Sequence, residues 1–195
     1  MRSWWPPLLR RLATVTGCSE SNALLLETLE WQFRMSWDLA RNFHLCRVND
    51  EVCLWMPDVA ASTVRLESDG AWHGDWIEPA AGEPWAVSVA WLTWHLQLWL
   101  TQALAEMAEA EVPGHRDVVW PGSASAAIAQ LDRLAAEWAQ VLRAVRAEDL
   151  DRPTTFPWPD PRPLRRLLAW VNMEMMKNAA ELGAAVNAAL LSVRA

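Results

Sequence analysis

The chain has 195 residues, a net charge of −7 at pH 7 and a pI of about 5.1. Its length suits a single domain with a substantial buried core. The acidic balance argues against nucleic acid as a partner, because phosphate binding needs clustered lysine and arginine. Lys177 is the only lysine, so the basic residues are otherwise arginines.

Tryptophan and cysteine usage also limits the class of protein. There are fifteen tryptophans and no tyrosine. Each indole brings a large apolar area and one N–H that needs an acceptor. These tryptophans are either core and loop anchors or, in part, the lining of a ligand cavity. Three cysteines, Cys18, Cys46 and Cys53, fit no metal or redox spacing, and this low, odd count indicates reduced thiols in a cytoplasmic protein.

Residues 1–20 are expected to be an N-terminal extension. The start, MRSWWPPLLRRLATVTGC, ends in a stretch like a lipoprotein cleavage box. However, prolines and an arginine pair interrupt the apolar region that a signal sequence requires. We therefore expect no signal peptide here.

The first predicted helix follows the capping region Ser19-Glu20-Ser21 and ends near Asn42. Its apolar residues recur at helical spacing, at Leu26, Leu29, Phe33, Trp37 and Ala40. The connection that follows is long, from residue 44 to residue 84. It holds Asp69-Gly70, a hairpin signal, between residues 64–66 and 72–76. We expect a small two-stranded ribbon there, or an ordered loop packed by its tryptophans.

The second predicted helix begins with a run of 21 residues without formal charge, 85–105, and extends to about residue 110. Partial alternation at Val87, Val89 and Trp91 imitates a strand, but strands rarely exceed about 10 residues. The run is long enough to span a bilayer. It also contains six polar side chains, so we expect a buried helix of a soluble protein and no membrane partner.

Two further helices complete the predicted fold. One runs from about Ser123 to Arg146 after the Pro121-Gly122 breaker, and the other from Pro163 to about Ser192. Five prolines between residues 151 and 163 predict a stiff, extended connector. Four long helices with long first and third connections predict an all-α four-helix bundle, formed by residues 21–192 of one domain covering 1–195.

The candidate site combines a histidine with polar residues of the last helix. His95 lies near the middle of the uncharged run, and an unpaired buried imidazole costs ~1–3 kcal/mol. Glu174, Asn178 and Glu181 stand at i, i+4 and i+7, on one helical face. Imidazole and carboxylate suit zinc or nickel, but an amide oxygen is a poor third ligand. The alternative is a polar core cluster in which Glu174 and Asn178 hydrogen-bond His95.

A ligand pocket is the second prediction for this region. Trp99 stands one turn beyond His95 and should lie beside it. We expect Trp99 and Glu181 to line a pocket whose polar end is His95 with Glu174, suited to a small organic ligand. Alternatively, Trp99 is solid core or faces the second copy in a homodimer. The other histidines are expected to be solvated in loops, namely His44, His73 and His115.

Four stretches, in this order and spacing, resemble the DinB/YfiT-like superfamily, which includes mycothiol-dependent maleylpyruvate isomerases. They are LLLETLEWQFRMSWDLA, DGAWHGDWIEP, VAWLTWHLQLWL and WVNMEMMKNAAELG. The resemblance implies a four-helix bundle with a divalent metal on three side chains. His95 and Glu174 match two of these positions. Asn178 stands where a second histidine is expected, which implies a weakened or lost metal site.

Two functions follow as hypotheses. The resemblance implies a transferase or isomerase that uses a low-molecular-weight thiol of the mycothiol type, with His95 and Glu174 as residual metal ligands. A metal-bound thiol loses its proton and becomes a nucleophile, so a missing ligand undermines this chemistry. The alternative is a non-catalytic small-molecule-binding or stress-associated protein on the same scaffold. The expected partner is accordingly a small organic molecule or a thiol.

Overall fold

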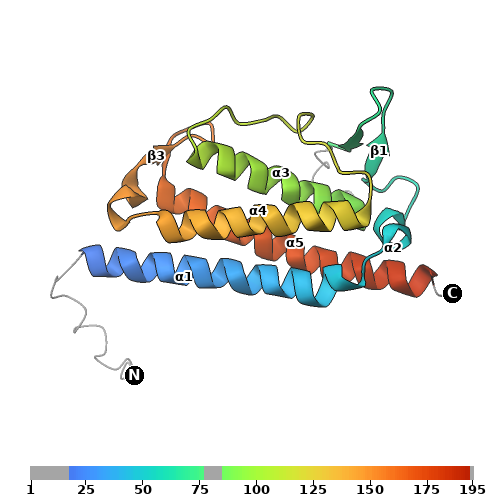
Figure 1. The fold of residues 1–195 in the computed structure, drawn as a ribbon, viewed down its shortest axis with the longest axis horizontal. Coiled ribbons are helices and arrows are strands. Elements are labelled where there is room, and N and C mark those ends of the chain that lie inside the picture. Colours follow the sequence, from blue (N-terminus) through green and yellow to red (C-terminus); the bar gives the residue numbers. More distant parts are fainter. Residues whose placement is uncertain (1–17, 77–84, 194–195) are drawn as a thin grey trace, which may run out of the picture.

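The structure is a computed structural model that describes residues 18–76 and 85–193. Four long helices pack side by side, and a short helix and a hairpin lie at one end of the bundle (Figure 1). The predicted all-α four-helix bundle is confirmed. The helices are α1 (Cys18–Leu39), α2 (Asp50–Leu54), α3 (Val89–Met107), α4 (Ala124–Ala144) and α5 (Leu164–Val193).

Capping side chains fix where three of these helices begin. Asn49, Ser88 and Ser123 each accept a hydrogen bond from a backbone N–H in the first turn of α2, α3 and α4. The helix predicted from residue 85 therefore starts at Val89. The preceding Val87 forms a single bridge with Ser62, whereas Val89 and Trp91, the other residues of the strand-like alternation, lie in the helix.

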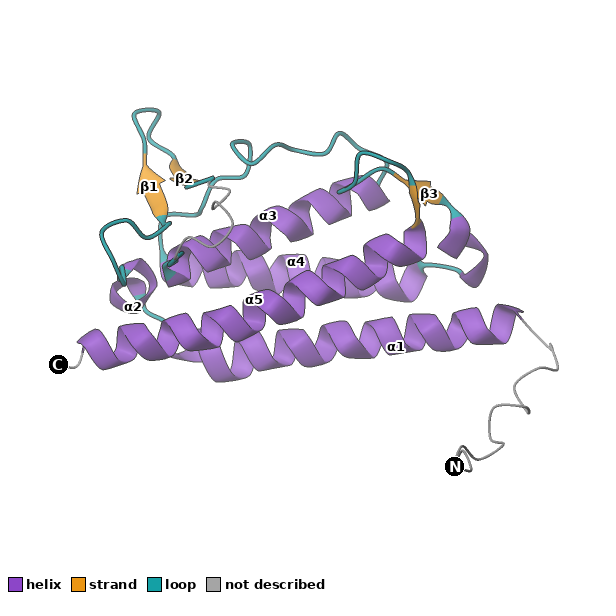
Figure 2. Ribbon diagram, turned by 180° about the vertical axis from the view of Figure 1, so that it is seen from behind, coloured by secondary structure: helices purple, strands orange, loops and turns teal. Residues whose placement is uncertain are grey.

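The long helices form two pairs. The helices of each pair are parallel, and the two pairs run in opposite directions. α1 and α5 run parallel, as the Asn172 Nδ2 bond to the Leu29 carbonyl and the Arg47–Asn187 bond show. α3 and α4 run the other way and pack against them (Figures 1 and 2). Because α3 and α4 are parallel, the segment 108–123 must return along the length of the bundle. It does so over the outer side of α3 (Figure 1).

The first connection contains the predicted hairpin. β1 (Val64–Leu66) pairs antiparallel with β2 (Trp72–Gly74), with Gly70 at φ +80° in the turn. Asp50 and Glu51 open the short helix α2.

The prediction of an extended connector between α4 and α5 is wrong. The segment forms a 3₁₀ turn, η4 (Ala147–Asp151), and a second hairpin of β3 (Pro153–Thr154) with β4 (Arg162–Pro163). The two ends of the segment meet, since the Leu164 N–H donates to the Arg152 carbonyl across 2.7 Å. Prolines stiffen a chain, but they also suit the ends of short edge strands, so their number did not determine an extended path.

Helix α3 is the centre of the molecule. Every residue from Val89 to Leu98 is buried, although some of them are polar. α4 and α5 cover two sides of α3, and the first hairpin and the returning segment 108–123 cover the rest (Figure 1). None of the helices in the described part of the chain is both long and apolar enough to cross a membrane.

Candidate functional site

Most polar side chains of α3 hold the long connections in place. The Trp91 indole donates to the Asp75 carbonyl at 2.7 Å, and the Trp94 indole donates to the Val118 carbonyl at 2.7 Å. The amides of Gln97 and Gln102 likewise donate to backbone carbonyls of the segment 108–123. These contacts support the interpretation that most tryptophans are core and loop anchors.

His95 has a different role from its neighbours, because its imidazole reaches no connecting segment in the part of the chain that the structure describes. It is 8% exposed and stacks on Trp91 with ring centroids 4.4 Å apart. Its Nε2 accepts the indole N–H of Trp99 across 2.6 Å. Trp99 thus lies beside His95, as its position one turn further along α3 predicts.

The Trp99 bond determines the protonation state of His95. An indole nitrogen can only donate, so Nε2 must keep its lone pair for the bond. Burial, and to a smaller extent the positive charge of Lys177, lowers the pKa of His95 to about 3. The neutral ring therefore carries its proton on Nδ1. That Nδ1–H is buried and has no hydrogen-bond partner among the described residues.

On α5, Glu174 accepts a hydrogen bond from Asn178 and forms an ion pair with a lysine. The Lys177 ammonium lies 2.6 Å from Glu174 Oε2, and the Glu174 side chain is only 15% exposed. Asn178 is fully buried and donates from Nδ2 to the Glu174 carbonyl at 2.8 Å. The Asn178 Oδ1 has no partner within the described ranges.

The two helices bring His95 and Glu174 to about the same level of the bundle. α3 and α5 are antiparallel, and the rings of Trp99 and Trp170 meet edge to face at 5.1 Å. His95 lies one turn before Trp99 on α3, and Glu174 lies one turn after Trp170 on α5. Because the helices are antiparallel, both steps go in the same direction along the bundle. Lys177 lies close enough for its charge to act on His95.

Glu181 extends this polar group by two turns of α5. Its carboxyl is half-buried, and desolvation raises its pKa. The nearby charge of Lys177 opposes this rise, and that of Glu174 adds to it. No hydrogen bond joins His95 to Glu174 or Asn178 in the described part of the chain. The hydrogen bonds of the polar cluster therefore join residues of the same helix. The alternative offered by the sequence, in which Glu174 and Asn178 bond to His95 across two helices, is not what the structure has.

The donor atoms do not fit a divalent metal ion. A histidine ligand needs a free ring lone pair, and in His95 one nitrogen accepts the Trp99 N–H while the other carries the proton. The carboxylate of Glu174 already has a cation, the ammonium of Lys177. Across residues 18–76 and 85–193, no group of three or more His, Cys, Asp or Glu side chains is arranged to hold a metal.

The prediction for the remaining histidines is wrong for His73, which is 7% exposed. Its Nε2 lies 2.9 Å from the Asp69 carboxylate within the hairpin. His115 stacks on Trp76 at 5.0 Å, and His44 packs against Gly183, so both are partly covered. His73 is held within the hairpin, His115 of the returning segment lies on Trp76, and His44 lies against α5; sequence spacing could not show these contacts.

Sequence reasoning also missed Lys177 as a member of the site. Two signals could have indicated it: it is the only lysine in the chain, and it stands at i+3 from Glu174, a spacing at which opposite charges meet on a helix.

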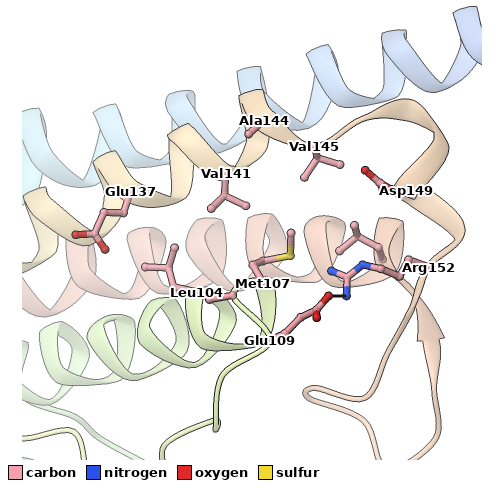
Figure 3. A pocket seen from close by; sticks show the side chains of 11 residues that line it. Leu104, Met107, Glu109, Glu137, Val141, Ala144, Val145, Asp149 and Arg152 are labelled. Carbon is pink, nitrogen blue, oxygen red and sulfur yellow. Dashed lines mark hydrogen bonds and ion pairs between the residues drawn. The ribbon is translucent and has the colours of Figure 1, made fainter.

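A separate cleft opens between the ends of α3 and α4, η4 and the start of α5 (Figure 3). Its volume is about 620 Å³, and its floor is apolar, with Leu104, Met107 and Val141. Arg152 and Glu109 form an ion pair of 3.4 Å at its edge. It lies about three turns along α3 from His95. Neither Trp99 nor any polar residue of that site lines it, so this cleft is not the pocket predicted beside Trp99.

Fold and site together define a helical-bundle protein with a neutral histidine buried among tryptophans. The sequence matches the DinB superfamily over residues 29–182, and the chain belongs to this superfamily. Neither a curated protein nor a solved structure matches it.

Proposed function

We propose that this member of the DinB superfamily is a non-catalytic small-molecule-binding protein and not a metal-dependent thiol transferase or isomerase. The observation that carries the proposal is the 2.6 Å bond from the Trp99 indole to Nε2 of His95. It occupies the lone pair that a metal would need. Without a metal at His95, the only cation of the described cluster that could stabilise a thiolate is the Lys177 ammonium, which already pairs with Glu174.

The chemistry around His95 indicates the ligand. Trp91 stacks on one face of the imidazole, and Trp99 meets its edge. Trp170 and Phe156 extend this aromatic wall, with centroids 5.1 Å and 6.2 Å from Trp99. The buried Nδ1–H is a donor that a ligand oxygen would satisfy, and satisfying it recovers ~1–3 kcal/mol. The proposed ligand is a small planar organic molecule with a hydrogen-bond acceptor.

Nuclear magnetic resonance with benzamide and benzylamine as probes tests the binding function. Both carry one aromatic ring, but only benzamide has an acceptor oxygen. We expect benzamide to shift the Trp99 indole resonance and the His95 Nδ1 resonance of the full chain, and benzylamine to leave both unchanged. Equal responses to the two probes, or shifts only in indoles remote from His95, would contradict the proposal.

The competing function, a thiol-dependent transferase or isomerase, makes a different prediction. It requires zinc or nickel at His95, Glu174 and Asn178, together with a mycothiol-type cofactor. Elemental analysis of protein purified without a metal-affinity tag distinguishes the two functions. One equivalent of zinc or nickel per chain, lost in a His95→Phe variant, would favour the thiol enzyme and refute the binding protein proposed here.

A further inference from the structure

The outer face of the α1–α5 pair carries large apolar side chains in solvent. Trp31 is 53% exposed, although nearly all other helical tryptophans of the chain are buried or half-buried. Met35, Met173 and Met176 are 47%, 62% and 46% exposed and surround it. Together they line a groove of about 560 Å³ between the two helices. We call this surface the α1–α5 face.

Helical spacing makes this face continuous. Leu24, Trp31 and Met35 stand at i, i+7 and i+11, so they lie in one stripe along α1. The bond from Asn172 to the Leu29 carbonyl places Met173 and Met176 of α5 level with the middle of that stripe. Contiguous apolar surface of this kind, rich in Trp and Met, is typical of protein interfaces.

The charges beside the stripe are arranged so that the face complements a copy of itself. Glu27 and Arg34 flank Trp31 along α1, and both are exposed. Neither has an ion-pair partner within residues 20–76 or 85–193. If two α1 helices cross antiparallel with their midpoint near Trp31, each Glu27 lies opposite Arg34 of the second copy. The pairing is then made twice, as two-fold symmetry requires.

The size of the face also suits a pair of identical chains. α1 has 22 residues, so the stripe is about 33 Å long at 1.5 Å per residue. Two helices packed roughly 9 Å apart present a face about 20 Å wide, hence about 650 Å². Two such faces bury about 1,300 Å² in total, which lies at the lower end of the roughly 1,200–2,000 Å² that stable interfaces bury.

We propose that two copies of this chain form a symmetric dimer through the α1–α5 face, with Trp31 beside the two-fold axis. Each Trp31 indole enters the groove between α1 and α5 of the other copy, where the methionines adapt to its shape. Glu27 and Arg34 set the antiparallel direction. This inference does not depend on the proposed ligand, because neither His95 nor Trp99 lines the groove, although Lys177 does.

Sedimentation equilibrium of the full chain, over a dilution series from about 100 µM, tests the dimer. We expect a mass of twice 22.0 kDa at the highest concentration. Trp31→Ala should weaken association at least tenfold and leave the helical circular dichroism unchanged, because Trp31 is on the surface. A wild-type chain that stays monomeric at 100 µM overturns the proposal, as does a dimer that Trp31→Ala leaves unaffected.

Charge reversal tests the direction of packing. Glu27→Arg and Arg34→Glu should each weaken association at least tenfold, because each creates two like-charge contacts. The double variant Glu27→Arg/Arg34→Glu should restore wild-type association. Glu51→Arg, an exposed acidic residue on α2, is the control and should leave association unchanged. A double variant no tighter than the single variants overturns the antiparallel pairing.

Discussion

The indole N–H of Trp99 donates to Nε2 of His95 across 2.6 Å, one turn further along the same helix. This contact satisfies one polar group of a buried imidazole with a residue of the same helix. It also leaves the second ring nitrogen protonated and unpartnered among the described residues. In a metal site built of the same residue types, Nε2 of the histidine would instead bind the metal. The Trp99 contact is therefore the feature that distinguishes the proposed binding site from a metal site.

His95 should stay neutral far below the usual histidine range. Its pKa in the folded chain is lowered to about 3 by burial and then by Lys177, whereas the unfolded chain titrates near 6.5. Imidazole nitrogen resonances, followed from pH 8 to pH 4.5, should show one Nδ1–H tautomer throughout. A titration with a midpoint above pH 5 would contradict this.

The same shift predicts how stability depends on pH. Below pH 6.5 the His95 side chain is protonated in the unfolded chain but stays neutral in the folded chain. His95 therefore destabilises the fold progressively as the pH falls from 6.5 toward 3. The slope from this group approaches ~1.4 kcal/mol per pH unit. Urea unfolding of wild type and His95→Phe at pH 7, 6 and 5 measures it. The free energy of unfolding of His95→Phe should fall less steeply with decreasing pH than that of wild type. Equal pH dependences for the two proteins would show the prediction wrong.

A zinc site should need more than one substitution. Asn178→His adds an imidazole, but Trp99 still holds Nε2 of His95 and Lys177 still pairs with Glu174. We expect little gain in zinc affinity from Asn178→His alone. The triple variant Asn178→His/Lys177→Met/Trp99→Phe releases both groups and should bind zinc about 100-fold more tightly. Calorimetry measures both affinities, with His95→Phe added to the triple variant as the control.

The helices were predictable because their apolar periodicity is a local property of the chain. The bounds of α4 and α5 agree with the sequence within about two residues. The hairpin 64–74 was predictable from Asp69-Gly70 for the same reason. The second hairpin was not, since proline content restricts the backbone without fixing which segments meet.

Partners of the site residues were less predictable than their positions. Helical wheels placed Trp99 beside His95, and the structure confirms it. They indicate that Lys177 can reach Glu174 at i+3 but do not establish that it does, because i+3, i+4 and solvent contacts compete at similar energies. The burial of His73 depends on how the hairpin packs, which involves residues far apart in the sequence.

Cys46 and Cys53 should differ sharply in reactivity. Cys53 is fully buried, and burial, with the nearby charge of Asp50, raises the pKa of its thiol to about 12. Cys46 is exposed. A disulfide reagent at pH 8, applied to a Cys18→Ser variant, should label one thiol per folded chain and two after unfolding. Rapid labelling of both thiols in the folded chain would contradict the buried position of Cys53.

The contact between Gly74 and Trp94 should be sensitive to a single methyl group. A Cβ on Gly74 would lie 2.1 Å from ring carbons of Trp94. That ring cannot move freely, because it is fully buried and its Nε1 donates to the Val118 carbonyl at 2.7 Å. Gly74→Ala should therefore lower the free energy of unfolding by about 2 kcal/mol or more, through overpacking.

A second glycine of the same hairpin provides the matched control. Gly70 has φ +80° and open space around its Cβ position, so Gly70→Asn keeps a tolerated left-handed residue without a clash. We expect Gly70→Asn to cost less than about 1 kcal/mol, hence a melting temperature within a few degrees of wild type. Gly74→Ala should lower it by roughly 4–8 °C or more. Similar melting temperatures for both variants would mean that β2 can move away from α3, and that the hairpin does not fix the position of Trp94.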